Sequence, residues 1–167
     1  HIPGHGRASA DTHFELPTVH ESLDELRRHD FAPFRALNDL PAAMTAHVVF
    51  SAIDTKGTAT TSGKVVEEVI RGEIGFNGLL ISDDISMKAL SGDFGSKAAA
   101  ILAAGVDIVL HCNGVMEEMA AAASKARALE GEALRRAGRA LSVTGHGDDG
   151  NEEELRAEFT EYFAAVA

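Results

Sequence analysis

Cysteine, tryptophan and long apolar runs are scarce or absent in this chain of 167 residues. Cys112 is the only cysteine, so the chain has no disulfide framework of its own, and a reducing compartment, the cytoplasm, is predicted. No stretch approaches the roughly 18 consecutive apolar residues of a membrane span, so no membrane association is predicted. Basic residues are outnumbered 26 to 15 by acidic ones, and the net charge of -11 argues against binding to nucleic acid or an anionic membrane.

Apolar residues make up 45% of the chain, which is enough for one domain with a packed core. They recur in short runs or at helical spacing, in an order that alternates helix and strand. That alternation is typical of parallel β/α units. Helices are predicted over residues 22–28, 31–37, 64–74, 97–104, 116–129 and 132–143, and strands over 42–50, 79–82 and 106–112.

The number of strands limits the architecture. Three clear strands are too few for a closed eight-stranded barrel, which needs about 250 residues. The alternatives are a small open sheet and about half of a barrel. After a polar break at residues 145–151, residues 152–166 are predicted to form a terminal amphipathic helix.

The central feature is an apolar run at residues 78–84, which read G-L-L-I-S-D-D. A short strand buried on both faces and ending in acids places charge at the carboxyl edge of a parallel sheet, where catalytic residues of barrels gather. Successive side chains point to opposite sides, so Asp83 and Asp84 cannot both enter one pocket. The alternative, which this pattern taken alone favours, is that both acids only begin the next helical turn as caps.

Residues 1–17 are predicted to be a loop that carries His1, His5, Asp11 and His13. These residue types bind metals, but their spacing fits no defined zinc pattern, so no metal is predicted. In an extended segment, residues two apart face the same side, so Asp11 can hold the His13 imidazole. A carboxylate partner orients the ring and stabilises its protonated form, as a proton shuttle near neutral pH requires. The alternative, favoured by spacing alone, is that His13 only caps the loop.

Three segments resemble, in the right order, motifs of the β-N-acetylglucosaminidases of glycoside hydrolase family 3. Residues 1–13 are similar to the family's K-H-F-P-G-H-G segment with D-x-H four residues later. Residues 43–48 resemble M-P-A-H-V, and residues 75–87 resemble G-F-x-G, three apolar residues and S-D-D-L-S-M. The chain departs from the pattern at Ile2, where the family has Phe, and it lacks the Lys that precedes His1 in the family.

The resemblance implies a role for each matching residue. Asp83 would be the nucleophile, His13 the general acid/base, and Asp11 the carboxylate that orients His13. His1 matches the family's sugar-binding histidine. His47 is a further candidate for substrate binding, with a satisfied core histidine as the alternative.

The resemblance also implies the fold, which is part of a (β/α)8 TIM-type barrel. Residues 1–144 would form the carboxyl-terminal half, about the last three or four β/α units, and residues 145–167 the polar break and terminal helix. The family's amino-terminal half carries an acidic residue and arginines that grip the sugar hydroxyls. We therefore expect activity to need that half as a partner.

The implied reaction removes a terminal, non-reducing β-linked N-acetylglucosamine from a saccharide, typically a muropeptide in peptidoglycan recycling, with retention of configuration and no cofactor. Retaining enzymes usually use two carboxyl groups. A deprotonated imidazole is neutral and would not repel an anionic acceptor, which opens a first alternative, a phosphorylase in which phosphate replaces water. A second alternative is a non-catalytic sugar-binding fragment, against which the presence of Asp83, Asp11 and His13 argues.

Overall fold

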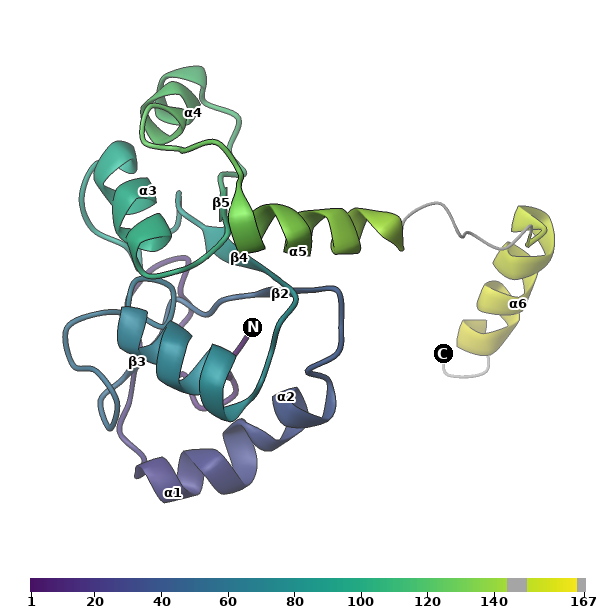
Figure 1. Cartoon of the computed structure of the whole chain (residues 1–167). Coiled ribbons are helices and arrows are strands. Elements are labelled where there is room, and N and C mark those ends of the chain that lie inside the picture. The colour runs from purple at the N-terminus through teal and green to yellow at the C-terminus, as the bar shows by residue number, and fades with distance from the viewer. Residues whose placement is uncertain (144–149, 165–167) are drawn as a thin grey trace.

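The computed structural model describes residues 1–143 and 150–164 and is built around a parallel sheet (Figure 1). The order of its three strands is β2–β4–β5, so each strand lies beside the one before it in the sheet. The register places Ala43 opposite Leu80 and Ile81 opposite Ile108. The strands are Ala42–Met44 (β2), Leu79–Asp84 (β4) and Ile108–Leu110 (β5).

The amino-terminal loop adds a fourth segment to this sheet. Ile2 forms a parallel bridge with Thr45, its N–H donates to the carbonyl of Met44 at 2.8 Å, and its carbonyl accepts from Ala46 at 3.1 Å. Thr45 donates to Ile81 on the other side, at 2.9 Å. The four segments therefore succeed one another in space in the order they have in the sequence, which is the order of strands in a β/α barrel.

A second, two-stranded parallel sheet was not predicted. It pairs β1 (Thr18–Val19), which follows the predicted loop and for which no element was predicted, with β3 (Val49–Phe50). The prediction of one strand over residues 42–50 is therefore wrong: β2 and β3 belong to different sheets. The sequence did not indicate this change of partner, because residues 42–50 read as one continuous, largely apolar run.

The helices follow the predicted order with shifted ends. The prediction of a helix from residue 97 starts too late, because the Asp93 side chain accepts from the Ser96 N–H at 2.9 Å and caps a helix that begins at Phe94. Two helices have π-type hydrogen bonding, as between Ile74 N–H and the Val69 carbonyl at 2.8 Å. The helices are Leu23–Glu25 (α1), Leu26–Asp30 (η1), Ala32–Ala36 (α2), Val65–Glu73 (η2), Phe94–Ala103 (α3), Met116–Ala123 (α4), Gly131–Ser142 (α5) and Glu152–Ala164 (α6).

The core lies between the sheet and the helices. The apolar face of η2, with Val65, Val69 and Ile70, is buried together with Leu80 of β4. Gly78, just before β4, has no room for a side chain, since a Cβ there would lie 2.5 Å from the carbonyl oxygen of Leu40. Burial of these side chains fixes β4 and so the position of the acids at its end.

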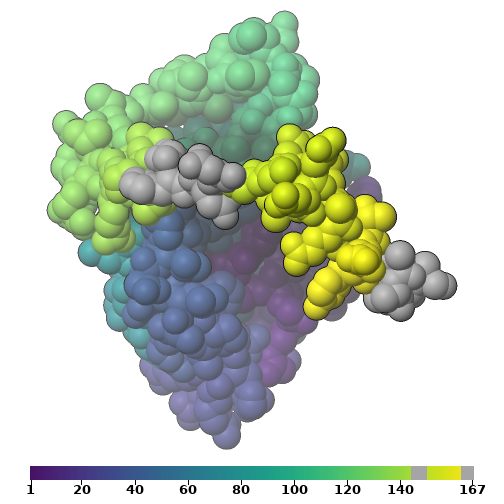
Figure 2. All heavy atoms as spheres, turned by 90° about the vertical axis from the view of Figure 1, so that its right-hand side faces the viewer, coloured from purple at the N-terminus to yellow at the C-terminus, as the bar shows by residue number. Residues whose placement is uncertain are grey.

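The last two helices lie outside this core. The α5 helix meets the amino ends of β4 and β5, where Arg136 binds Asp107 at 3.1 Å. The α6 helix stands apart from the rest of the chain and projects from its surface (Figures 1 and 2). A terminal helix was predicted over residues 152–166 and is present over Glu152–Ala164, while the end of that prediction and most of the predicted break at 145–151 lie outside the described residues. None of the helices described is long and apolar enough to cross a membrane.

Candidate active site

Asp83 lies at the carboxyl end of β4 and faces the first residue of the chain. Its Oδ2 is 3.3 Å from Nε2 of His1, and its Oδ1 accepts the N–H of Asp84 at 2.9 Å. The Asp83 side chain is 12% exposed and that of His1 is 42% exposed. One carboxylate oxygen is thus fixed by the backbone, while the other meets a side chain that solvent reaches.

This contact changes the protonation of both partners. Burial raises the pKa of Asp83, but the hydrogen bonds from His1 and from the Asp84 N–H outweigh it and hold this pKa below its ordinary value. The hydrogen bond to Asp83 raises the pKa of His1 against the opposing effect of burial. Asp83 is therefore ionised at neutral pH, the state that a carboxylate nucleophile requires.

Asp84 points the other way, as the alternation of the strand predicts. Its Oδ1 accepts the N–H groups of Ser86 at 3.0 Å and Cys112 at 3.1 Å, and its Oδ2 accepts the Ser86 hydroxyl. It therefore anchors the turn after β4 and ties that turn to the end of β5. The interpretation that both acids serve the following turn holds for Asp84 but does not account for the contact between Asp83 and His1.

His47 is completely buried below the two acids. Its Nε2 is 3.1 Å from the carbonyl oxygen of Asp84, which can only accept, so Nε2 carries a proton. Its Nδ1 is 2.8 Å from the Thr60 hydroxyl, and burial lowers the pKa of His47, which favours the neutral ring. Both nitrogens thus have protein partners, as in the alternative of a satisfied core histidine. Direct substrate binding by His47 stays a prediction.

Asp11 and His13 form the predicted pair. His13 Nδ1 is 2.7 Å from Asp11 Oδ1, which also accepts the His13 N–H at 2.9 Å. Bonds from the backbone and then the ring of His13 lower the pKa of Asp11. The expected contact is confirmed, but the expected extended segment is wrong. The N–H groups of Phe14 and Glu15 both donate to the Asp11 carbonyl, so a tight turn brings the two side chains together.

His1 and the pair formed by Asp11 and His13 lie in the same amino-terminal loop, and His5 lies between them in the sequence. The ring of His5 contacts that of His1 edge-on, with 5.8 Å between centroids, and His5 also lowers the pKa of Asp11. Within the described residues, no hydrogen bond or ion pair joins His13 to Asp83. The structure therefore assembles each pair without connecting them directly.

Several polar groups near Asp83 were not predicted from the sequence to belong to the site. The Ser82 hydroxyl accepts the Leu110 N–H at 2.9 Å, and His111 Nε2 is 2.9 Å from Glu118. Cys112 and His111 could have been found, because they end a predicted strand at the same edge of the sheet as Asp83. Ser82 lies inside a predicted apolar strand and gives no such signal.

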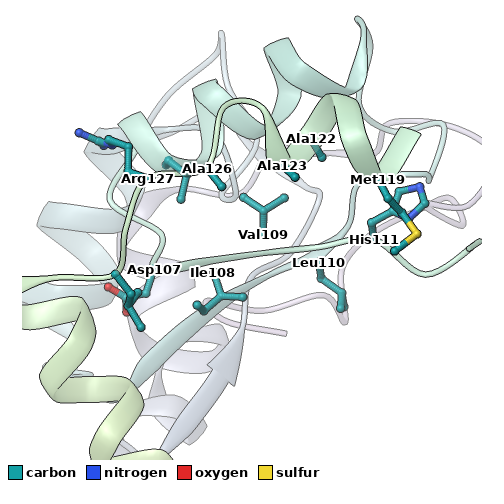
Figure 3. A pocket seen from close by; sticks show the side chains of 12 residues that line it. Asp107, Ile108, Val109, Leu110, His111, Met119, Ala122, Ala123, Ala126 and Arg127 are labelled. Carbon is teal, nitrogen blue, oxygen red and sulfur yellow. The ribbon is translucent and has the colours of Figure 1, made fainter. Parts of the chain in front are cut away.

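The candidate site is marked by its polar side chains. In the part of the chain that the structure describes, no group of three or more His, Cys, Asp or Glu is arranged to hold a metal ion. A cavity of about 460 Å³ lies between β5 and α4, lined by Val109, Leu110 and Met119 among others (Figure 3). Neither Asp83 nor His13 lines it, so we locate the candidate site by the polar groups and not by the cavity.

Sequential parallel β/α units with a carboxylate and histidines at the carboxyl ends of the strands are the arrangement of barrel enzymes. The chain belongs to glycosyl hydrolase family 3, because the model of that family's N-terminal domain matches residues 1–142. This domain has a TIM-barrel-type fold. The family that the three motifs suggested is confirmed.

Relatives support the assignment. The chain is 44% identical over 116 residues to a beta-hexosaminidase of Pseudomonas aeruginosa (strain LESB58), covering 68% of this chain and 35% of the relative. It is 41% identical over 117 residues to a beta-hexosaminidase of Bordetella avium (strain 197N), covering 68% of this chain and 33% of the relative. The chain thus spans about a third of the length of these curated relatives.

Solved structures agree with the assignment to this family. Native NagZ from Neisseria gonorrhoeae superposes with a TM-score of 0.72 at 33% identity, covering 94% of this chain and 44% of that one. A glycoside hydrolase family 3 beta-N-acetylglucosaminidase from Paenibacillus sp. str. FPU-7 superposes with a TM-score of 0.73 at 30% identity, covering 93% and 34%. NagZ has also been solved in complex with N-trifluoroacetyl-D-glucosamine.

Proposed function

We propose that this chain carries the catalytic groups of a retaining β-N-acetylhexosaminidase. The enzyme would remove terminal, non-reducing β-linked N-acetylglucosamine, with muropeptides of peptidoglycan recycling in the cytoplasm as its natural setting. The observation that carries the proposal is the ionised Asp83 carboxylate at a strand end, with one oxygen directed at a solvent-accessible histidine. The relatives named beta-hexosaminidase support the sugar class.

The reaction would proceed in two displacements. Asp83 attacks the anomeric carbon, while His13 gives its Nε2 proton to the leaving oxygen and Asp11 holds Nδ1. His13 then takes a proton from water, whose oxygen displaces Asp83 and restores the configuration. His1, whose Nε2 is 3.3 Å from Asp83, would bind a hydroxyl of the same sugar.

Completion of the barrel is part of the proposal. The β5 strand is the last of the sheet β2–β4–β5, and the apolar cavity of Figure 3 runs along it. In a barrel such a strand is covered by further β/α units, since an open edge with an apolar surface is unfavourable in water. We propose that the amino-terminal half of the barrel pairs here and supplies further sugar contacts.

The test detects the intermediate. We expect the His13→Ala variant of the full-length protein to gain the mass of one sugar on Asp83 within seconds of mixing with a nitrophenyl N-acetylglucosaminide. Nitrophenolate leaves without a proton, so the first step survives, while no base activates water for the second. Mass spectrometry of the intact protein and of its peptides measures the label.

Two carboxylate variants control this experiment. Asp83→Ala should take up no sugar, whereas Asp84→Asn should still be labelled, because both oxygens of Asp84 accept hydrogen bonds from Ser86 and Cys112. A label on Asp84, or a label that persists in Asp83→Ala, would refute the assignment of the nucleophile.

A phosphorylase is the second candidate, favoured by the pairing of Asp11 with a histidine as acid/base. After it has given its proton to the leaving group, the histidine ring is neutral and does not repel phosphate, which could then attack in place of water. Incubation of the full-length protein with substrate in phosphate buffer distinguishes the two: N-acetylglucosamine 1-phosphate indicates a phosphorylase, and free sugar alone indicates a hydrolase.

A further inference from the structure

The turn that carries the acid/base pair is exposed at its ends and buried at its centre. The side chains of Asp11 and His13 are 58% and 69% exposed. Thr12, between them, is only 4% exposed. A small side chain that is buried in the middle of an exposed turn indicates that the turn packs against another part of the protein.

The packing partner is the segment that follows the nucleophile strand. The Ala89 N–H donates to the Thr12 carbonyl at 3.3 Å. Met87, Ala89 and Leu90 of this segment are themselves buried. The segment begins at the turn that Asp84 anchors, and Ala89 follows Asp83 by six residues. Thr12 therefore connects the turn of His13 to the strand of Asp83, although their side chains have no direct contact.

A second anchor fixes the beginning of the same loop. The guanidinium of Arg7 binds Asp30 through Nε at 2.8 Å, and it lies 3.4 Å from Glu21 and 3.5 Å from Glu25. The loop is therefore held at two points, by Arg7 on the first helices and by Thr12 at Ala89.

We propose that Thr12 is a positioning residue for the acid/base pair, and this inference rests on the proposed function. Thr12 lies against residues 87–90 and so sets the distance and orientation of the His13 imidazole relative to Asp83. A charged side chain at position 12 cannot stay buried without a partner, so it moves the turn away from this segment. The His13 imidazole is then misplaced for proton transfer, while Asp83 and the groups that bind the sugar keep their positions.

The experiment compares Thr12→Glu with Ala104→Glu in the full-length protein. Ala104 is also 4% exposed but lies at the end of α3, away from the acids. For each variant, kcat/KM is measured with a disaccharide, whose leaving group is a sugar alkoxide, and with a nitrophenyl glycoside. General acid catalysis contributes about 10²- to 10⁴-fold, and only the alkoxide depends on it strongly.

We expect Thr12→Glu to lower kcat/KM for the disaccharide at least about tenfold and for the nitrophenyl glycoside by less than about twofold. Ala104→Glu should lower both equally or neither. Thr12→Ser, which stays small, should restore the profile of the unmodified protein. If Thr12→Glu does not fold, Thr12→Gly replaces it. We expect Thr12→Gly to lower kcat/KM for the disaccharide about threefold or more relative to its effect on the nitrophenyl glycoside.

Hydrogen exchange gives an independent readout. The Ala89 amide should exchange faster in Thr12→Glu, and its exchange rate should be unchanged in Ala104→Glu. Equal losses for both substrates, no loss for either, or an unchanged Ala89 amide would overturn the positioning role. These results leave the proposed function intact as long as the unmodified protein cleaves both glycosides. An unmodified protein that cleaves neither overturns the function and this inference together.

Discussion

Asp83 and Asp107 are both buried aspartates at the ends of neighbouring strands, yet they lie at opposite edges of the sheet. Asp83 stands at the carboxyl end of β4, and Asp107 immediately precedes β5. The number of fixed partners differs between them. Asp83 has one backbone N–H and one histidine, whose charge depends on pH.

Asp107 has a permanent partner at each oxygen. Its Oδ2 accepts from Arg71 at 2.8 Å and from the Leu80 N–H at 2.9 Å, and its Oδ1 accepts from Arg136 at 3.1 Å. These partners come from η2, β4 and α5, so one carboxylate ties three elements together. Arg71 also donates to the carbonyl of Gly78, which closes the turn before β4.

The comparison shows that burial alone does not mark a reactive carboxylate. Two guanidinium groups and an N–H leave Asp107 no free direction toward a substrate, so its role is structural. Asp83 keeps one oxygen for a partner that a substrate can replace. We therefore expect substitution of Asp83 to affect chemistry and substitution of Asp107 to affect stability.

The largest effect is expected for Asp83→Asn, which removes the proposed nucleophile and keeps the shape of the side chain. We expect kcat to fall by about 10⁴-fold or more, with thermal unfolding changed little. Steady-state kinetics of the full-length protein with a nitrophenyl glycoside measures the loss. A variant with more than about 1% of the original kcat would show that Asp83 does not differ from Asp107 in this way.

The Asp107→Ala variant tests whether Asp107 has a structural role. Removal of the Asp107 carboxylate leaves the charges of Arg71 and Arg136 uncompensated. We therefore expect the free energy of unfolding to fall by about 3–5 kcal/mol. Urea denaturation at neutral pH measures this, while kcat per folded molecule should stay within about twofold. The control is Asp24→Ala, whose exposed carboxylate lies 3.6 Å from Arg27 and should contribute less than about 1 kcal/mol.

A smaller effect is expected for Asp11→Ala, which leaves Asp83, the proposed nucleophile, in place. His13 loses the group that orients it, so kcat for a disaccharide should fall about 10- to 100-fold with KM nearly unchanged. Glu15→Ala, in the same turn, is the matched control and should have no such effect. Unchanged turnover in Asp11→Ala would exclude the orienting role.

The smallest effect concerns the titration of His1. Because the pKa of His1 is raised, its contribution to stability is complete below the ordinary value of about 6.5 and is lost as the pH rises through the higher folded value. Because the pKa of Asp83 is lowered, its contribution is present above its unfolded value and is lost as the pH falls through the lower folded value. The pair therefore stabilises the fold between these two limits, by less than about 1 kcal/mol.

Substitution of Asp83 tests this directly. In Asp83→Asn the pKa of His1, followed by NMR of its ring protons, should fall toward the ordinary value. In Asp84→Asn it should stay raised, because Asp84 binds Ser86 and Cys112 and not His1. An equal response to both substitutions would mean that the electrostatic environment of His1 does not come from Asp83.

The sequence by itself determined the features that depend on neighbours along the chain. The alternation of a strand placed Asp83 and Asp84 on opposite sides, and the spacing of two residues paired Asp11 with His13. The apolar run at 79–82 lies within β4, and the motifs identified the family. Such signals survive in a single sequence because backbone periodicity and local hydrogen bonds create them.

The tertiary structure alone decided contacts between distant segments. His1 meets Asp83 across 82 positions, and Asp107 collects Arg71 and Arg136 from different helices. The two strands within residues 42–50 separate because each pairs with a different neighbour. Thr12 is buried, and its carbonyl accepts the N–H of Ala89, a residue more than 70 positions away, which its own sequence context does not indicate. Packing of whole elements determines these contacts, and a local pattern records only that a residue is apolar or polar.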